Sequence, residues 1–147
     1  MTPRFLRYET KRRVEFRDTD AAGIVHFSAF FVYMEQAEHE LLRSLGTSVA
    51  MRDDEGEIGW PRVSASCDYH NAARFEDVLD VEVSVQRLGR KSVTYGFHFA
   101  RDEIEIARLS RERMGDMIST RQALERARQA DPLNVDAIRQ LAELIAD

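Results

Sequence analysis

The chain has 147 residues, of which 44% are hydrophobic, and a formal net charge of −5 at pH 7. This length suits one domain with one ordinary core and excludes a second full domain. The negative charge gives no overall basic field for nucleic acid, and Cys67, as the one cysteine, cannot form an intramolecular disulfide. No apolar run reaches the roughly 20 residues that span a bilayer, and the N-terminus lacks a secretory signal, so we expect a cytoplasmic protein without a membrane span.

The first predicted elements are a strand and a long helix, joined by an acidic motif. Val14 and Phe16 alternate with charged residues, which predicts a strand that ends at Asp18-Thr19-Asp20-Ala21-Ala22-Gly23. Apolar residues then recur at steps of three and four, which predicts an amphipathic helix with Ser28 as N-cap and Gly46 as its stop. The predicted core face holds Phe27, Phe30, Phe31, Met34, Ala37, Leu41 and Leu45, and the other face mostly Glu35, Gln36, Glu38, His39 and Arg43.

Three later segments alternate apolar and polar residues, as antiparallel strands do. They begin at Arg62, Leu79 and Val93, and Leu88–Lys91 provides the turn between the second and the third. Residues 47–61 have little periodicity and are predicted as a solvated connection. A strand, a long helix and several antiparallel strands pack most economically as a sheet wrapped around the helix.

The pattern changes beyond about residue 108. Glu103–Ile106 can begin a further strand, but the charged residues from Arg108 to Asp116 leave it no sustained apolar face. Apolar spacing after residue 117 instead predicts two helices separated by Asp131-Pro132. We therefore expect a domain over residues 1–110, a helical C-terminal extension over residues 111–147, and a sheet that lacks its last strand or is completed by a partner.

The acidic motif lies directly before a helix, and this arrangement can form an acyl-transfer site. A helix N-terminus offers unpaired N–H groups and a partial positive charge, and a carboxylate beside it can attack an acyl carbonyl or activate water. The same residues are also common in ordinary turns, because the Asp side chain accepts hydrogen bonds from nearby backbone amides and Gly tolerates a positive φ. Ala22 and Ala29 replace oxygen ligands of a calcium loop, and no His or Cys spacing fits zinc, so we predict no metal.

The segment from Val14 to about Arg108 resembles the 4-hydroxybenzoyl-CoA thioesterase family of hotdog-fold proteins. The motif fits the family signature D-x-D-x-x-G-[IV]-[VI], and the following helix carries Tyr33-Met34-Glu35-Gln36-Ala37. The resemblance implies an α+β hotdog fold, an antiparallel sheet wrapped around a long central helix, here with an atypical helical C-terminal segment. It also implies an acyl-CoA thioesterase with no cofactor apart from the coenzyme A of its substrate, assembled as a homodimer or homotetramer.

The resemblance also implies roles for particular residues. The second aspartate of the family motif is the catalytic carboxylate, nucleophile or general base, and corresponds to Asp20. The family's oxyanion donor is a backbone N–H at the start of the central helix, and corresponds to Phe27. His26 is a candidate substrate contact, since some members carry a His one place later. Glu35 is a reserve candidate, because a second hotdog group places its catalytic Glu on this helix, although a solvated face explains it about as well.

Three basic residues cluster at the predicted turn between the second and third later strands. Arg87, Arg90 and Lys91 are candidate contacts for the phosphates of coenzyme A, and a solvated turn explains them equally well. A second basic run, from Arg4 to Arg13, is predicted as an exposed sheet edge that discourages aggregation. His70 and His98 lie on predicted strands, where a structural hydrogen-bonded role is expected.

Two other functions compete with the thioesterase. A hotdog dehydratase carries a His-Phe-Pro segment, whereas His26-Phe27 is followed here by Ser28. A non-catalytic acyl-CoA-binding or assembly protein of the same fold is favoured by the altered C-terminal segment. The sequence leaves open the acyl group, the carrier (coenzyme A or acyl carrier protein) and the choice between nucleophile and general base for Asp20.

Overall fold

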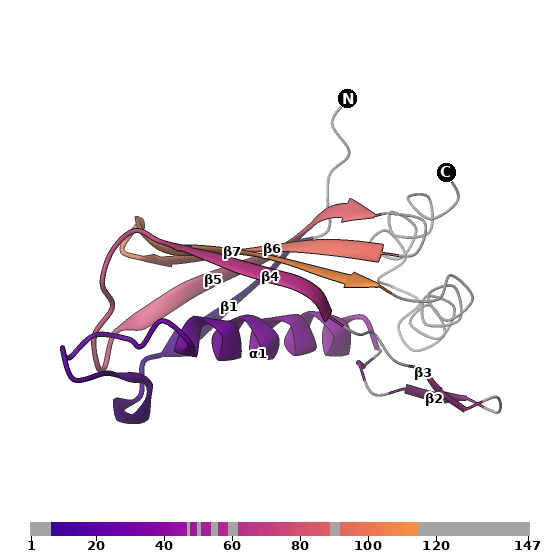
Figure 1. Cartoon of the computed structure of the whole chain (residues 1–147), viewed down its shortest axis with the longest axis horizontal. Helices are drawn as coiled ribbons and strands as arrows, with labels where there is room; N and C mark the ends of the chain where they lie inside the picture. The colour runs from indigo at the N-terminus through magenta and orange to yellow at the C-terminus, as the bar shows by residue number, and fades with distance from the viewer. Residues whose placement is uncertain are drawn as a thin grey trace.

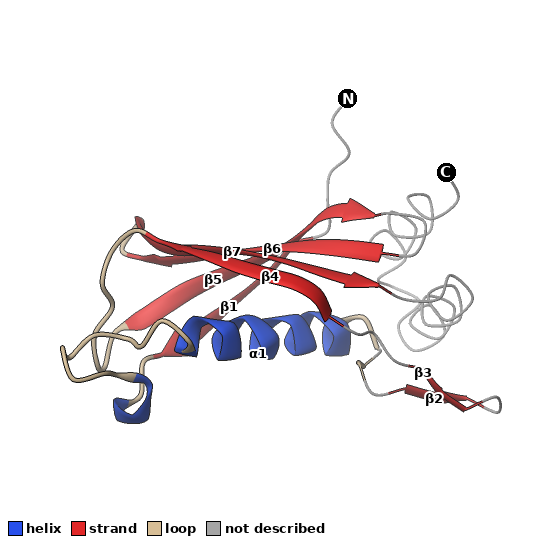
Figure 2. Ribbon diagram, in the orientation of Figure 1, coloured by secondary structure: helices blue, strands red, loops and turns tan. Residues whose placement is uncertain are grey.

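A computed structural model describes residues 7–46, 48–49, 51–53, 56–58, 62–88 and 92–114. Its main feature is an antiparallel five-stranded sheet with the long helix α1 (Ala29–Ser44) lying along one face (Figure 1 and Figure 2). The strand order is β1-β5-β6-β7-β4, with the bounds β1 Arg7–Arg13, β4 Arg62–Tyr69, β5 Val78–Leu88, β6 Ser92–Arg101 and β7 Ile104–Met114. A small hairpin, β2 (Met51–Asp53) and β3 (Gly56–Ile58), lies beyond the end of α1 within residues predicted as a connection. The predicted sheet around a helix is confirmed.

The hairpin of β5 and β6 builds most of the sheet's core face. Alternate residues of β5, from Leu79 to Val85, are at most 2% exposed, and those of β6, from Val93 to Phe99, at most 8%. Val83 pairs with Phe97 across the hairpin. The period-2 pattern therefore predicted both strands correctly, and the turn at residues 89–91 lies outside the described residues.

Helix α1 begins and ends where the sequence predicts, and its buried stripe packs against the sheet. The stripe holds Phe30, Tyr33, Met34, Ala37, Glu38 and Leu41. Two predictions about its faces are wrong: Phe27 precedes the helix and is 62% exposed, whereas Glu38, four residues after Met34 and so on the same face, is fully buried. Gly46 follows the helix with φ +74°, a conformation that favours glycine. No helix in the described ranges is long and apolar enough to cross a bilayer.

The first strand differs from the prediction. Strand β1 ends at Arg13, and Phe16–Asp18 form a short 3₁₀ helix in place of the predicted strand end. The Glu15 amide donates to Asp18 Oδ2 at 3.0 Å, and the Asp18 amide to the Glu15 carbonyl at 2.9 Å, which closes this turn. Phe16 is consequently 76% exposed, so its alternation with Val14 did not mark a strand face.

The basic run lies at the edge of the sheet, as predicted, and three of its side chains, those of Arg7, Lys11 and Arg12, are ion-paired with neighbouring elements. Lys11 Nζ lies 2.5 Å from Asp80 Oδ1 of β5, and the carboxylate raises the pKa of Lys11. Arg7 lies 3.5 Å from Glu82. Arg12 turns the other way and pairs with Glu40 of α1, so that this one side chain connects the edge strand to the helix.

The expectation that the last strand is missing is wrong. Strand β7 lies between β6 and β4 and supplies Ile106, Ala107 and Leu109 to the core, each at most 1% exposed. Because the opposite sheet face meets solvent, every second residue can be charged, as Arg108 is, without weakening the strand. Strand β7 runs past residue 110, the expected domain boundary. Of the predicted helical extension, residues 111–114 belong to β7 and residues 115–147 lie outside the described residues.

Shortening the side chain at Met34 should destabilise the fold through the helix–sheet interface. Met34→Ala removes a fully buried side chain, so we expect the free energy of unfolding to fall by about 2–5 kcal/mol. Val32→Ala is the control on the same helix, because Val32 is 56% exposed, and should change it by less than about 0.5 kcal/mol. Chemical denaturation followed by circular dichroism measures both. Equal losses would contradict the packing described for α1.

The Arg12–Glu40 pair should make stability depend on acid pH. Burial alone would raise the pKa of Glu40, but hydrogen bonds from Thr10 and Arg12 and the Arg12 charge hold it below its usual 4.5. Unfolded Glu40 therefore takes up a proton first as the pH falls, and the stabilisation is present above pH 4.5 and lost below it. Glu40→Gln should cost about 1 kcal/mol at pH 7 and progressively less below pH 4.5. Glu103→Gln in an exposed turn is the control, and parallel pH profiles for Glu40→Gln and wild type would refute the assignment.

Candidate functional site

The acidic motif forms a tight turn built on Asp20. Asp20 Oδ1 accepts a hydrogen bond from the Ala22 amide at 2.8 Å, and the Asp20 amide donates to the Ile24 carbonyl at 2.9 Å. Gly23 donates to the Asp20 carbonyl at 3.0 Å and has φ +76°, so glycine is needed here for the backbone conformation. The turn expected from the sequence, with an Asp side chain bonded to a nearby amide and a glycine at positive φ, is therefore present. Its hydrogen bonds determine the position of the Asp20 carboxylate.

Asp18, the first aspartate of the motif, has a different environment. Its carboxylate accepts from the Tyr33 hydroxyl at 2.7 Å and from the Glu15 amide, and its carbonyl accepts from the His26 amide at 2.8 Å. Burial, together with this hydrogen bond, raises the pKa of Tyr33, so the phenol remains a donor. Asp18 thus joins the loop to α1 and holds both ends of the motif in place.

A cavity of about 320 Å³ opens beside the motif and contains Asp20 and Phe27, the two predicted catalytic residues. Its walls come from the motif, the start of α1 and the loop after β4, and are mostly apolar. They are formed by Asp20, Ile24, Val25, Phe27, Phe30, Tyr69, His70, Asn71, Ala72 and Ala73. The fold therefore brings a carboxylate and a helix start to one apolar hollow, although the lining residues are up to 53 positions apart in the chain.

The amide of Phe27 is an open donor at the helix start. Within the described part of the chain, the Phe27 N–H makes no hydrogen bond, whereas the next two amides, of Ser28 and Ala29, donate to His26 Nδ1 at 3.2 Å and to the His26 carbonyl at 2.9 Å. Phe27 directly precedes the N-cap residue Ser28, so its amide adjoins the helix N-terminus, where the partial positive charge favours an anion. The residue that the resemblance assigns as oxyanion donor therefore has an amide available for that role.

His26 takes part in this turn and does not line the cavity. Its ring packs against the Phe27 ring with 4.5 Å between centroids, and its Nδ1 lies 2.7 Å from Ser28 Oγ. Because the Ser28 amide donates to Nδ1, a neutral His26 ring carries its hydrogen on Nε2. Ser28 occupies the predicted N-cap position. Its side chain makes no capping hydrogen bond to the helix, however, and is hydrogen-bonded to His26 instead.

Sequence patterns did not single out Tyr69 or Asn71, which also line the cavity. Tyr69 ends β4 and Asn71 lies in the loop that follows it. No local motif marks them, because only the folding of β4 back beside the start of α1 brings them to the cavity that Phe27 lines. His70, the third lining residue of this stretch, lies 4.0 Å from Glu105, and His98 lies 3.6 Å from the same carboxylate. A hydrogen bond from Arg108, and then the two imidazoles, lower the pKa of Glu105.

The remaining candidates lie elsewhere or outside the described residues. Glu35 pairs with Arg62 at the start of β4 and does not line the cavity. Arg87 is an exposed residue of β5, whereas Arg90 and Lys91 lie outside the described residues, so the predicted basic cluster is not placed. Burial raises the pKa of the half-buried Cys67 thiol, which disfavours the thiolate that a nucleophile requires.

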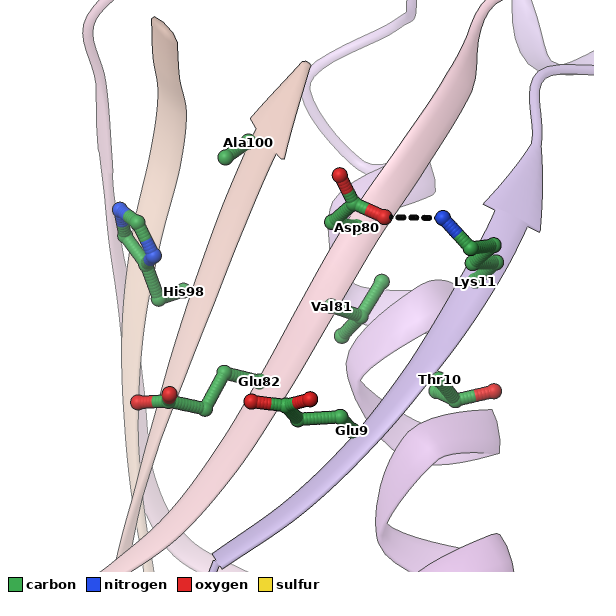
Figure 3. A pocket seen from close by; sticks show the side chains of 8 residues that line it. All are labelled: Glu9, Thr10, Lys11, Asp80, Val81, Glu82, His98 and Ala100. Carbon is green, nitrogen blue, oxygen red and sulfur yellow. Dashed lines mark hydrogen bonds and ion pairs between the residues drawn. The ribbon is translucent and has the colours of Figure 1, made fainter. Parts of the chain in front are cut away.

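A larger cavity, of about 530 Å³, lies on the sheet face opposite α1 (Figure 3). Its charged side chains come from β1 and β5, His98 of β6 also lines it, and Figure 3 shows the ion pair of Lys11 and Asp80 at one side. None of the predicted catalytic residues lines it. Among the described residues there is also no group of three or more His, Cys, Asp or Glu side chains arranged to hold a metal ion. The smaller cavity at Asp20 is therefore the candidate site.

The sequence and the fold both have relatives among known proteins. Residues 22–107 match the family model of the thioesterase superfamily. The chain is 35% identical over 98 residues to a putative esterase of Aquifex aeolicus, covering 67% of this chain and 76% of that protein. It is 28% identical over 101 residues to a 1,4-dihydroxy-2-naphthoyl-CoA hydrolase of Synechococcus elongatus, covering 68% and 74%.

A solved structure with the same fold is that of 4-hydroxybenzoyl-CoA thioesterase from Pseudomonas sp. strain CBS-3. It superposes with a TM-score of 0.65 at 23% identity, covering 74% of this chain and 84% of that one, and so supports the hotdog fold. The family resemblance seen in the acidic motif and the following helix is confirmed. The chain belongs to the thioesterase superfamily and is a thioester hydrolase.

Proposed function

We propose that the protein hydrolyses an acyl-CoA thioester to coenzyme A and a carboxylic acid, with Asp20 as its catalytic carboxylate and the Phe27 amide as its oxyanion donor. The observation that carries the proposal is that Asp20 and Phe27, whose amide is open, border one cavity. Two relatives support the substrate class by name: the naphthoyl-CoA hydrolase and an acyl-CoA thioesterase of Haemophilus influenzae that is 26% identical over 96 residues.

The proposed reaction needs two actions from the site. Asp20 either deprotonates a water molecule that attacks the thioester carbon or attacks that carbon itself, after which water releases the acid. In both routes a C–O bond forms, the C–S bond breaks and the thiol leaves with a proton. Negative charge on the carbonyl oxygen is stabilised by the Phe27 N–H and the positive end of α1. Removing one such donor costs about 2.7–4 kcal/mol of barrier in other enzymes.

The non-catalytic alternative rests on the altered C-terminal segment. One part of that argument, a sheet without its last strand, does not hold, because β7 is present between two other strands. Residues 115–147 lie outside the described residues. Arg87, Arg90 and Lys91 remain proposed contacts for the phosphates of coenzyme A, and His26 a proposed contact for the substrate. The Nε2–H of a neutral His26 is the group available for it, since Nδ1 is occupied by Ser28.

We further propose that protomers assemble through the edge strand β4. The two edges of the sheet differ: β1 carries Arg7, Lys11 and Arg12, whereas β4 exposes Val63 and Tyr69 at 53% and 47%. An exposed apolar edge with unpaired backbone groups is suited to pairing with another chain, while charged edges resist it. A homodimer, or a homotetramer built from dimers, would cover this edge.

The first test is the activity of Asp20→Asn. With a panel of aliphatic and aromatic acyl-CoAs and the matching acyl carrier protein thioesters, the variant should release free thiol at least about 100-fold more slowly than wild type. Asp80→Asn, which removes an exposed carboxylate that does not line the cavity, is the matched control and should keep full activity. A nearly active Asp20→Asn would remove Asp20 from the mechanism, and no turnover of any substrate by folded wild type would favour the binding-protein alternative.

The assembly proposal is tested by placing a charge on the β4 edge. Val63→Lys should shift the protein toward monomers, because pairing of two β4 strands would then bring like charges together. Light scattering coupled to size-exclusion chromatography measures the mass of wild type and variant. Ile104→Lys, at a 49% exposed residue that starts β7, an interior strand of the sheet, should leave the mass unchanged. A monomeric wild type, or an unaltered Val63→Lys assembly, would refute pairing through β4.

A further inference from the structure

We propose that Tyr69 is a positioning residue that fixes the direction of the Phe27 amide by donating a hydrogen bond to the Phe27 carbonyl. This inference rests on the proposed function, in which the Phe27 amide receives the oxyanion. Tyr69 belongs to the edge strand β4, and its hydroxyl reaches the Phe27 carbonyl at 2.8 Å across 42 residues of sequence. It is therefore the link between the sheet edge and the backbone turn at the start of α1.

The two peptide groups that flank the Phe27 Cα atom have four polar groups between them, and three are bonded within the described residues. The His26 carbonyl accepts from the Ala29 amide at 2.9 Å, the Phe27 carbonyl accepts from Tyr69, and the Ser28 amide donates to His26 Nδ1 at 3.2 Å. The fourth group is the Phe27 N–H. The peptide planes on both sides of Phe27 are thus held by hydrogen bonds, and the one group left for a substrate is the proposed oxyanion donor.

Because the peptide bonds are trans, these hydrogen bonds determine the direction in which the Phe27 N–H points. In a trans peptide the C=O and the following N–H point in opposite directions, and the chain has no cis peptide among its described residues. Since the His26 carbonyl is directed at the Ala29 amide of the first helical turn, the Phe27 N–H points away from that turn. Tyr69 adds the second constraint, because its bond to the next carbonyl limits rotation about the Phe27 backbone.

Tyr69 is itself held in place and stays a donor. Its ring packs edge-on against Phe30 of α1, with 5.6 Å between centroids and 67° between the ring planes, and Phe30 packs in turn on Phe99. Burial, and then the neighbouring Cys67, raise the pKa of Tyr69 to about 12, so its hydroxyl keeps its proton near neutral pH. Both Tyr69 and Phe27 line the cavity, which places this hydrogen bond at the wall of the candidate site.

Loss of the Tyr69 hydroxyl should therefore affect the transition state more than substrate binding. The charge that the Phe27 amide stabilises develops only as the carbonyl is attacked, so a misdirected amide lowers kcat and leaves KM nearly unchanged. We expect Tyr69→Phe to lower kcat about fivefold, with KM within about twofold of wild type, since a single neutral hydrogen bond is lost. The substitution keeps the aromatic contact with Phe30 and should leave the fold intact.

The experiment compares the steady-state kinetics of wild type, Asp20→Asn, Tyr69→Phe and Tyr8→Phe on one acyl-CoA that the wild type hydrolyses. Tyr8→Phe is the matched control, because the Tyr8 hydroxyl also makes a side-chain hydrogen bond, to Glu40 at 3.4 Å, but borders no part of the cavity. It should keep the wild-type kcat. An unchanged kcat for Tyr69→Phe, or a raised KM with kcat intact, would overturn the role of Tyr69 while the Asp20→Asn result still tests the proposed function separately.

A spectroscopic measurement distinguishes positioning from a general loss of structure. In the Asp20→Asn background an acyl-CoA should bind without turnover, and difference infrared spectroscopy of a ¹³C-labelled carbonyl reports the hydrogen bond that it receives. Adding Tyr69→Phe should weaken the downshift of the C=O stretch, whereas adding Tyr8→Phe should not. The same downshift with and without the Tyr69 hydroxyl, at equal melting temperatures, would refute the positioning role.

Discussion

The candidate site depends on the packing of the N-terminal end of α1 against the sheet. Phe30, in the first turn of the helix, contacts Tyr33 on its own helix, Phe99 in β6 and Tyr69 in β4, with centroid distances of 5.5–5.9 Å. Burial of aromatic rings is among the larger stabilising contributions in a small core. Because these rings come from three elements, they hold the helix start at one place on the sheet, and with it the open amide of Phe27. The apolar core thereby determines where an anion can be received.

The two aspartates of the motif, Asp18 and Asp20, have different roles in the loop before α1. Asp18 directs its carboxylate inward, to the Tyr33 hydroxyl and the Glu15 amide, and its side chain is only 17% exposed. The Asp20 carboxylate accepts a hydrogen bond within its own turn, and Asp20 lines the cavity. One carboxylate is therefore structural, and the other, two residues away, is held on a rigid turn beside a helix N-terminus. A pair of acidic residues at this spacing can serve both purposes because the intervening backbone changes from a 3₁₀ helix to an extended segment.

Much of this arrangement could be predicted from the sequence, because it depends on short-range patterns. The helix face from Phe30 to Leu41 and the alternation in β5 and β6 are periodic signals, and the motif is contiguous. The sequence pattern did not predict strand β7, because one buried face needs few apolar residues and most of the other residues of the strand are charged. Tyr69 and Asn71 were missed for a different reason: their relation to Phe27 is a contact across 42 or more residues, and nothing near them in the sequence encodes it.

If the Phe27 amide is the oxyanion donor, as proposed, the role does not depend on the side chain of residue 27. The Phe27 side chain is 62% exposed and packs on His26, while the amide's direction is set by the His26 carbonyl, the His26 ring and the Tyr69 hydroxyl. The chemical group that matters belongs to every residue except proline. The constraint on the site therefore falls on the groups that hold the backbone of residue 27. These groups belong to His26, to Ala29 at the start of α1 and to Tyr69 of β4. Substitution at residue 27 leaves the amide in place, whereas two of the groups that direct it, the His26 ring and the Tyr69 hydroxyl, are side chains and can be changed one at a time.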